Sequence, residues 1–254
     1  MDEPIRLPTK NFIPAIDSHF PRVKQSYPID VSIERRHWTT LYPTNHDTDY
    51  LKDSFVEFTL DSEPGTFLDV SSILLEINLE LLKSDGTQPV DDDAVIFANG
   101  LIHTIIKSRK LYLNSELVES DHHSNYTRYI NTMSNVDGER IYRQGLKSGY
   151  FPLDYGASLH KSEPKATFLD GATTNGRNNY RKQGRIQMCG ALDLDLGKSN
   201  MLLPDLVNGR LHLDLADVSQ IIQKPSDDAN NYSIKIYSIK LHYERVTPVT
   251  NAYI

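Results

Sequence analysis

The stretch 73-ILLEINLELL-82 decides the fold class of this chain, because polar and apolar residues alternate through its centre. Glu76, Asn78 and Glu80 fall on one face of an extended backbone, whereas every odd position from 73 to 81 is Ile or Leu. Successive side chains of a β-strand point to opposite faces of the sheet. The stretch therefore predicts a core strand with one buried face and one polar face.

The segments on either side continue this pattern. Upstream, 54-SFVEFTLD-61 places Val56, Phe58 and Leu60 in one phase and predicts a second half-buried strand. Downstream, 99-NGLIHTIIKSRKLYLNSELVES-120 predicts a short helix that runs into a β-hairpin with a two-residue turn at 114–115. The apolar positions of that helix are Leu101, Ile102, Ile105 and Ile106.

In the middle of the chain the spacing of apolar residues changes from that of a strand to that of a helix. A helical face is predicted after residue 121, followed by a shorter helical piece at 139–146 and by a long exposed loop at 151–184 that is rich in Gly, Asn and Thr. The residues that mark the helical face are Tyr126, Tyr129, Ile130 and Met133. This region is predicted to be an insertion between strands.

The last third returns to strands. Alternation predicts strands in 185-RIQMCGALDLDL-196, 208-NGRLHLDLADV-218 and 232-YSIKIYSIKLHYERV-246. In the final run the apolar phase shifts after Ile236, and a β-bulge near Tyr237 and Ser238 would explain the shift. Many strands with polar outer faces, no alternation of strands with helices and one helical insertion together predict an all-β antiparallel jelly-roll sandwich.

The range over which residues alternate predicts the domain boundaries. Residues 1–50 contain six prolines without sustained periodicity, which predicts an extended N-terminal arm that lies on a neighbouring subunit or on the domain itself. The jelly-roll domain is expected to span 51–247, and a short C-terminal tail 248–254. The basic and acidic residues of the arm nearly balance, so docking on protein is expected rather than DNA binding.

Composition limits the classes of function. The chain has 254 residues and a formal net charge of −7, which argues against sequence-specific nucleic-acid binding. No apolar run approaches the roughly 20 residues of a transmembrane helix, and the first residues lack the apolar core of a signal peptide, so a cytoplasmic or nuclear setting is expected. Cys189 is the only cysteine, which excludes an intrachain disulfide and predicts a small buried apolar residue.

Three acidic or histidine-containing clusters are candidate sites. The first, Asp91, Asp92 and Asp93, lies on one loop and is interpreted as solvated, because adjacent carboxylates do not converge on a metal without further ligands.

The second cluster is Asp121, His122 and His123, whose adjacent positions do not match a metal-binding pair of histidines on a strand; we interpret it as structural or solvent-facing. In the third, Asp193 and Asp195 read as the solvated side of a strand rather than as an acid–base pair. Phosphate-binding, nucleophile-elbow and zinc-protease patterns are also missing from the sequence. We therefore assign no catalytic, cofactor-binding or metal-binding residues and expect a protein that is not an enzyme.

The order of these segments resembles the N-terminal jelly roll of double jelly-roll major capsid proteins, especially those of Polinton/Maverick elements and related large DNA viruses. The resemblance covers about residues 50–246 and rests on the strand 55–61, the stretch 99–120, the helix 125-NYTRYINTM-133 and the late segments 202–215 and 232–246. Family members carry two jelly rolls in one chain and form trimers. The sequence leaves open whether this chain is half of such a protein or a single-barrel relative.

The resemblance implies a structural capsid-type protein that self-assembles, as a trimer or a five- or six-fold capsomer, and contacts other capsid proteins. It implies a location in the virion, with assembly in the host cytoplasm or nucleus. The alternative is a jelly-roll module that binds carbohydrate or another ligand, with aromatic side chains that would stack on a sugar. The candidates for that stacking are Trp38, Tyr150, Phe151 and Tyr155.

Overall fold

The computed structural model describes residues 33–45, 55–90, 93, 95–134, 149, 184–199, 202–225 and 228–249. Its elements in chain order are β1 (Ile33–Leu41), β2 (Phe55–Leu60), β3 (Phe67–Lys83), β4 (Ile96–Phe97), α2 (Leu101–Thr104), β5 (Ile106–Leu113), β6 (Glu116–Asp121), α3 (Ser124–Ser134), β7 (Arg185–Ala191), η5 (Leu196–Ser199), β8 (Leu202–Leu203), β9 (Gly209–Leu215), α7 (Val218–Ile221), β10 (Ile222–Gln223) and β11 (Tyr232–Pro248).

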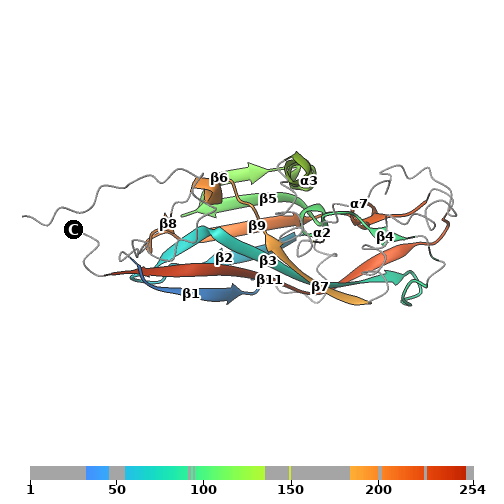
Figure 1. The fold of residues 1–254 in the computed structure, drawn as a ribbon, viewed down its shortest axis with the longest axis horizontal. Helices are drawn as coiled ribbons and strands as arrows, with labels where there is room; N and C mark the ends of the chain where they lie inside the picture. Colours follow the sequence, from blue (N-terminus) through green and yellow to red (C-terminus); the bar gives the residue numbers. More distant parts are fainter. Residues whose placement is uncertain are drawn as a thin grey trace, which may run out of the picture.

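Two antiparallel sheets form a sandwich (Figure 1). One has the strand order β1-β11-β3-β7, with the short β8 also paired to β3, and the other has the order β2-β9-β5-β6. Of the main strands, only β5 and β6 are consecutive in the chain and neighbours in one sheet; every other main connection crosses to the opposite sheet. This strand order is that of a jelly roll, so the predicted fold class is confirmed.

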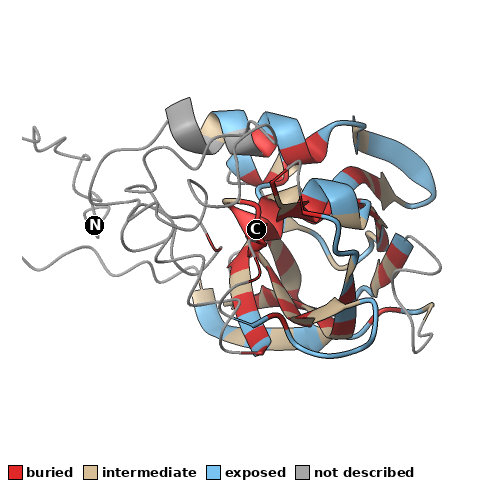
Figure 2. Cartoon of the chain, turned by 90° about the vertical axis from the view of Figure 1, so that its right-hand side faces the viewer, coloured by how far each residue is buried: buried red, intermediate tan, exposed pale blue. Residues whose placement is uncertain are grey.

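The core lies between the inner faces of the sheets, where apolar residues at alternate positions meet (Figure 2). On β3, the predicted phase is confirmed, because Ile73, Leu75, Ile77, Leu79 and Leu81 are all buried. Facing them are buried residues of β2, β5 and β9, which include Phe58, Leu111, Leu211 and Leu213. Burial of this apolar area on both inner faces is the main force that holds the sandwich together.

Local signals in the sequence also match the structure. The turn between β5 and β6 has Asn114 and Ser115 at φ values of 49° and 73°, the left-handed conformation that two-residue hairpin turns require. The register of β11 against β3 shifts between Ile236 and Ser238, where the bulge was predicted. The predicted helix begins at Leu101 and is buried, but it ends at Thr104, so Ile106 is the first residue of β5 instead.

The N-terminal region departs from the prediction. Residues 33–41, placed in the extended arm by their lack of clear periodicity, form β1 and pair with β11 from Ile33 opposite Pro248 to Leu41 opposite Leu241. The main sheet therefore begins before residue 51. The sequence of β1 does not alternate cleanly because it is an edge strand with one charged and exposed face. Residues 1–32 lie outside the described residues.

Three smaller predictions are corrected. Strand β7 ends at Ala191, so Leu192 and Leu194 are buried outside any strand and Leu196 starts η5. Cys189 is half-buried rather than buried, because it lies on the outer face of β7. Asp93 is buried and lies 2.6 Å from Lys83 Nζ, so it is an ion-paired part of the fold and not solvated. The predicted helix at 139–146 lies outside the described residues.

Candidate functional site

The structure does not bring together the three side chains of the segment 121–123, which are the strongest metal-ligand candidates in the sequence. Asp121 ends β6, and its Oδ1 accepts a hydrogen bond from the backbone N–H of His123 at 3.1 Å. His122 is exposed, with its Nε2 3.4 Å from Ser120 Oγ. Throughout the described ranges, no three His, Cys, Asp or Glu side chains are placed so that they could hold one metal ion. In this segment Asp121 acts through its backbone contact and its proximity to Arg109.

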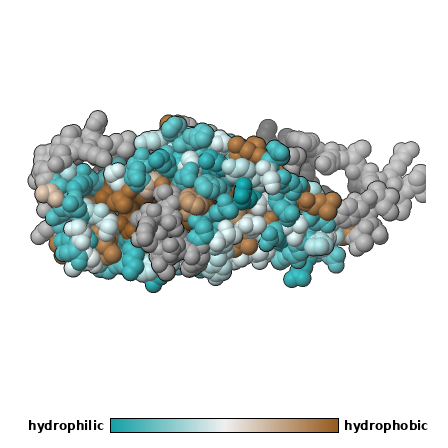
Figure 3. Space-filling model, turned by 180° about the vertical axis from the view of Figure 1, so that it is seen from behind, coloured by the Kyte–Doolittle hydropathy of each residue, from teal (hydrophilic) through white to brown (hydrophobic). Residues whose placement is uncertain are grey.

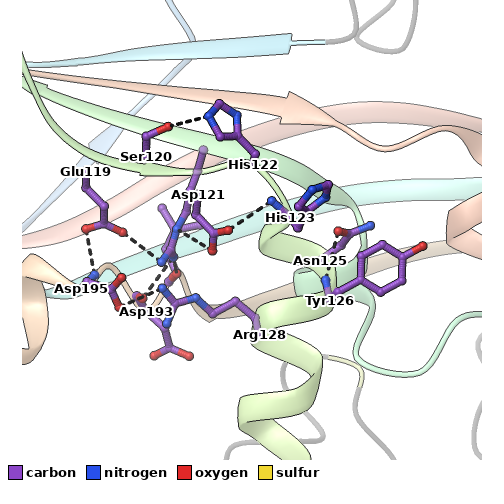
Figure 4. A network of polar contacts seen from close by, with 12 residues as sticks. Glu119, Ser120, Asp121, His122, His123, Asn125, Tyr126, Arg128, Asp193 and Asp195 are labelled. Atoms are coloured by element: carbon purple, nitrogen blue, oxygen red, sulfur yellow. Dashed lines mark hydrogen bonds and ion pairs between the residues drawn. The ribbon is translucent and has the colours of Figure 1, made fainter.

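Arg109 is the centre of a polar network, and its partners Glu119, Asp121 and Asp193 are labelled in Figure 4. Its side chain is 1% exposed, and Nη1 donates to the carbonyl oxygens of Leu192 at 2.6 Å and Asp193 at 3.0 Å. Its Nη2 lies 2.9 Å from Glu119 Oε1, and its Nε lies 4.0 Å from Asp121 Oδ2. A buried guanidinium is tolerated only when paired and hydrogen-bonded. Arg109 thus ties the β5–β6 hairpin to the segment that follows β7 in the other sheet.

The register of β5 explains why this charge points inward. Arg109 is opposite Leu213 of β9, and Leu111 is opposite Leu211, so Arg109 shares the inner face with core leucines. A register shift between Ile106 and Ser108 sets this phase. Burial of Arg109 was not predicted from the sequence. A usable signal was present, because Arg109 has the same phase as Leu111 and Leu113 and so places a charged residue on the apolar side of a strand.

Glu119 and Arg128 extend the network to α3. Glu119 Oε2 accepts hydrogen bonds from the backbone N–H groups of Asp195 at 2.8 Å and Leu196 at 3.2 Å. Arg128, with 4% of its side chain exposed, donates to Asp195 Oδ1 at 3.1 Å. The segment 192–199 is therefore held by β5, β6 and α3 together.

Asp193 and Asp195 are both exposed, as predicted, but they do not lie on a strand, which corrects that part of their interpretation. Asp193 has φ 50° in the segment after β7, and its carbonyl oxygen accepts from Arg109. The Asp195 carboxylate binds Arg128 and also Lys198 Nζ at 2.6 Å. Strand β7 ends at Ala191, so neither aspartate lies on a strand. Both lie in the segment that connects the two sheets and accept hydrogen bonds that hold it.

Two of the residues that mark the predicted apolar face of α3 point to solvent instead of to the core. Tyr126 and Ile130 are 58% and 59% exposed, whereas Ser124, Asn125 and Arg128 are buried. Arg128 determines this orientation, because Asp195 offers it a charged partner on the inner side. An apolar stripe on α3 is thereby left facing outward.

His103 of α2 lies close to this network and is buried. Burial lowers the pKa of His103, the negative charge of Asp193 opposes that shift, and the positive charge of Arg109 adds to it. The imidazole is therefore neutral at neutral pH. A neutral buried histidine beside an arginine fits a structural role.

Ser108, Asp214 and His212 form a second polar cluster, between β5 and β9. The Ser108 hydroxyl donates to the Asp214 carboxylate, and His212 Nε2 lies 2.9 Å from Asp214 Oδ1. Burial raises the pKa of Asp214, but the hydrogen bonds from Ser108 and His212 outweigh it and lower the pKa overall. The carboxylate lies between serine and histidine, whereas activation of a serine nucleophile requires the histidine next to the hydroxyl.

The exposed apolar side chains gather in separate places, and Figure 3 shows such patches among hydrophilic residues on one face. They lie on β1 and the residue after it, on β6, on α3 and around β8, and include Trp38, Tyr42, Leu117, Val118, Leu202 and Leu206. Of the aromatic residues predicted to stack on a sugar, Trp38 is exposed on β1, and Tyr150, Phe151 and Tyr155 lie outside the described residues.

One of these places lies beside loops that are joined by hydrogen bonds. Asn114 and Asn208 exchange hydrogen bonds, with Asn114 N donating to Asn208 O at 2.8 Å and Asn208 N donating to Asn114 Oδ1 at 3.0 Å. Asn208 Oδ1 also accepts from Ser62 N at 3.0 Å. Beside these joined loops, Leu206 is 83% exposed. Leu206 is the most exposed large apolar side chain among the described residues.

Comparisons with known proteins address the fold. No protein-family model matches the sequence, and no curated protein matches it significantly. A chain in the cryo-EM structure of the Sputnik virophage matches with a TM-score of 0.54 at 11% identity, over 98% of this chain and 55% of that chain.

Two further solved structures match less closely. The PBCV-1 virus capsid matches with a TM-score of 0.45 at 12% identity, over 89% of this chain and 44% of that one. The mavirus major capsid protein matches with a TM-score of 0.43 at 12% identity, over 97% and 53%. This chain spans about half the length of the chains it matches. It has the jelly-roll fold that was predicted, and shares that fold with the chain from the Sputnik virophage.

Proposed function

We propose that this protein is a structural, capsid-type building block that self-assembles through protein–protein contacts into a viral or virus-derived shell. The observation that carries the proposal is the jelly-roll strand order, β1-β11-β3-β7 against β2-β9-β5-β6, which aligns with a chain of the Sputnik virophage over 98% of the present chain. A fold alone does not specify a function, so the surface and the polar clusters must agree with it.

The polar clusters support a structural role. The charged groups of the Arg109 network are engaged with backbone carbonyls, backbone N–H groups and each other. Glu119 and Arg128 hold the segment 192–199 in the same way. In the Ser108 cluster, the carboxylate of Asp214 separates the hydroxyl from the imidazole of His212. These arrangements stabilise the connections between sheets.

The exposed apolar residues support assembly. Leu206 at 83%, Tyr126 at 58% and Trp38 at 55% exposure lie on three different parts of the surface. A shell subunit needs several distinct contact surfaces, because it must meet more than one neighbour. None of the helices in the described ranges has the length and apolar character needed to cross a bilayer.

The N-terminal residues supply a further proposed contact. Residues 1–32 precede β1, which begins at Ile33 opposite Pro248, so this segment joins the domain at the end of the sheet where β11 finishes. Its prolines and nearly balanced charge suit docking on a neighbouring subunit. The proposed partners are further copies of this chain and other capsid proteins, and the proposed location is the virion, after assembly in the host cytoplasm or nucleus.

Light scattering coupled to size-exclusion chromatography tests the proposal. We expect a homo-oligomer at micromolar concentration, trimeric if a second jelly roll is supplied and five- or six-fold if it is not. Electron microscopy of the oligomer peak would show rings or larger particles. A strictly monomeric 28.9 kDa species over a wide concentration range, together with binding on a glycan array, would contradict assembly and favour a carbohydrate-binding module.

A further inference from the structure

The four edge strands of the sandwich differ in length and in how their outer edges are covered. Strand β1 has 9 residues, β7 has 7, and β2 and β6 have 6 each. An uncovered edge presents backbone N–H and C=O groups that can pair with another strand. The longest edge, β1, therefore offers the most groups for such pairing.

The edge of β2 is covered by the chain that follows β1. Thr44 N donates to the carbonyl oxygen of Glu57 at 2.7 Å, and Asn45 Nδ2 donates to the carbonyl oxygen of Phe55 at 3.0 Å. The N–H of Glu57 donates to Asn45 Oδ1 at 2.8 Å. The Asn45 side chain thus makes the hydrogen bonds that a neighbouring strand would make, so these backbone groups of β2 already have partners.

The edge of β1 has no such cover within the described part of the chain. Its ladder is made with β11 on one side, and no described residue donates to or accepts from its backbone on the other side. On the regular part of the strand its outward side chains are Arg36, Trp38 and Thr40, all exposed. Arg36 Nη1 donates to Glu244 at 3.1 Å, and 47% of the Arg36 side chain remains exposed, so it is accessible to a residue across the edge.

Two copies of β1 in antiparallel orientation would place compatible side chains opposite each other. A register shift between Ile33 and Arg35 leaves Arg35–Leu41 as the regular part of β1, and a register centred on His37 pairs 35–39 of the two copies. It places Arg36 opposite Trp38 twice and Arg35 opposite Thr39 twice, with no two like charges directly opposed. A guanidinium over an indole ring is attractive, whereas the register centred one residue earlier would oppose Arg36 to its own copy.

We propose that β1 of one molecule pairs antiparallel with β1 of a second copy across a two-fold axis at His37, which joins two β1-β11-β3-β7 sheets into one. This inference rests on the proposed function and deepens it by naming one contact surface. Rings close through head-to-tail contacts, whereas a shell also requires contacts that join one ring to the next, and a two-fold strand pair meets that requirement.

Substitutions of opposite charge at Trp38 test the pairing. Trp38→Lys places a positive charge opposite Arg36 of the second copy on both sides of the axis and should weaken the two-fold association at least about tenfold. Trp38→Glu places a negative charge opposite the same arginine and should stay within about threefold of the wild type. Tyr42→Lys, at an exposed position beyond the end of β1, is the matched control and should behave as wild type.

Sedimentation velocity over a concentration series measures the association, and thermal melting of each variant verifies folding. Within one molecule Trp38 is opposite Glu244, so Trp38→Lys should fold at least as well as Trp38→Glu, the reverse of their order in association. Equal association of Trp38→Lys and wild type, or equal weakening by both substitutions, overturns the strand pairing but leaves assembly intact. A wild type that is monomeric at every concentration overturns the pairing and the proposed function together.

Discussion

Arg109 shows how a single residue can depend on the whole fold. Its neighbours in the chain predict an ordinary hairpin strand, yet its side chain is buried and its partners come from positions 119, 121, 192 and 193. Each partner removes part of the cost of taking the guanidinium out of water. The same arrangement makes the site vulnerable, because the loss of the cation leaves a mostly buried carboxylate and two carbonyl groups without their donor.

We expect Arg109→Leu to lower the free energy of unfolding by about 3–5 kcal/mol, since removing one partner of a buried ion pair leaves the other uncompensated. Arg210→Leu is the control, because the Arg210 side chain is 50% exposed and lies 3.9 Å from Glu57 on the sheet surface. That change should cost no more than about 1 kcal/mol. Urea unfolding measures both, and equal losses would contradict the structural role of Arg109.

Glu80 predicts a pH dependence of stability. A hydrogen bond from the Tyr237 hydroxyl, 2.5 Å away, and a second from Gln88 hold the pKa of Glu80 below its ordinary value of 4.5. A carboxyl with a lowered pKa in the folded state stabilises the protein above its unfolded pKa, and this stabilisation disappears as pH falls through the folded value.

Tyr237→Phe should therefore be less stable than the wild type at neutral pH, and the difference should narrow as the pH falls below about 4.5. Urea unfolding at a series of pH values measures this difference. Tyr42→Phe is the control, since Tyr42 is an exposed tyrosine whose ring lies near Lys240. A difference that stays constant across the acid range would contradict the contact with Glu80.

At the scale of elements, alternation predicts strands well where one face is buried and the other is polar. The inner face of β3 is buried at every predicted position, and β9 buries Leu211, Leu213 and Leu215 in the same way. Alternation fails at 192–196, where the leucines keep their period but the chain has left the sheet. It also fails at β1, whose exposed face is charged.

The strand assignment of β3 is tested by adjacent substitutions. Ile77 is 1% exposed, so Ile77→Asp would bury a carboxylate without a partner and should cost several kcal/mol or prevent folding. Asn78 lies on the outer face and accepts a hydrogen bond from Arg185 Nε at 3.0 Å. Asn78→Asp should change stability by about 0.5 kcal/mol or less. Equal melting temperatures for the two variants would contradict the assignment.

The boundary between arm and domain is tested by paired deletions. Removing residues 1–32 should leave a folded domain with weaker assembly, whereas removing 1–41 also deletes β1 and exposes the edge of β11, and should lower the melting temperature markedly. Circular dichroism and light scattering measure the two effects. If the shorter deletion abolished salt-sensitive DNA binding and left assembly unchanged, the proposed docking of the arm would be wrong.

At the scale of the whole molecule, the two sheets are joined by a shared apolar core and by polar ties at the ends of the strands. The Arg109 network joins the hairpin β5–β6 to the segment after β7. Arg245, nearly buried at the end of β11, donates to the carbonyl oxygen of Asp61 and to Thr66 Oγ1 between β2 and β3. These ties fix the connections between the sheets at 61–66 and 192–199.

Assembly predicts that thermal stability depends on protein concentration. Association that occurs only in the native state adds a stabilisation that grows with the logarithm of concentration, so the melting temperature should rise between about 1 and about 100 micromolar. Differential scanning calorimetry at several concentrations measures this. Trp38→Lys should flatten the dependence in part, because it removes only one proposed contact, and a flat curve for the wild type would contradict self-association.

The sequence by itself determined the features that depend on neighbouring residues. The buried phases of β2, β3 and β9, the short helix α2, the turn at Asn114 and Ser115 and the bulge after Ile236 all follow from local alternation and turn chemistry. Together they were enough to predict the jelly-roll class. Alternation works at this range because each side chain's direction is set by the backbone of its own strand.

Only the tertiary structure decided which charged residues are buried and which apolar residues face outward. Arg109 and Arg128 are buried because the segment 192–199 supplies their partners, and Ile130 is exposed because Arg128 takes the inner face of α3. Asp93 is buried because Lys83 lies beside it across a loop. Burying a charge requires a partner, and that partner can come from any part of the chain, so a local pattern cannot predict it.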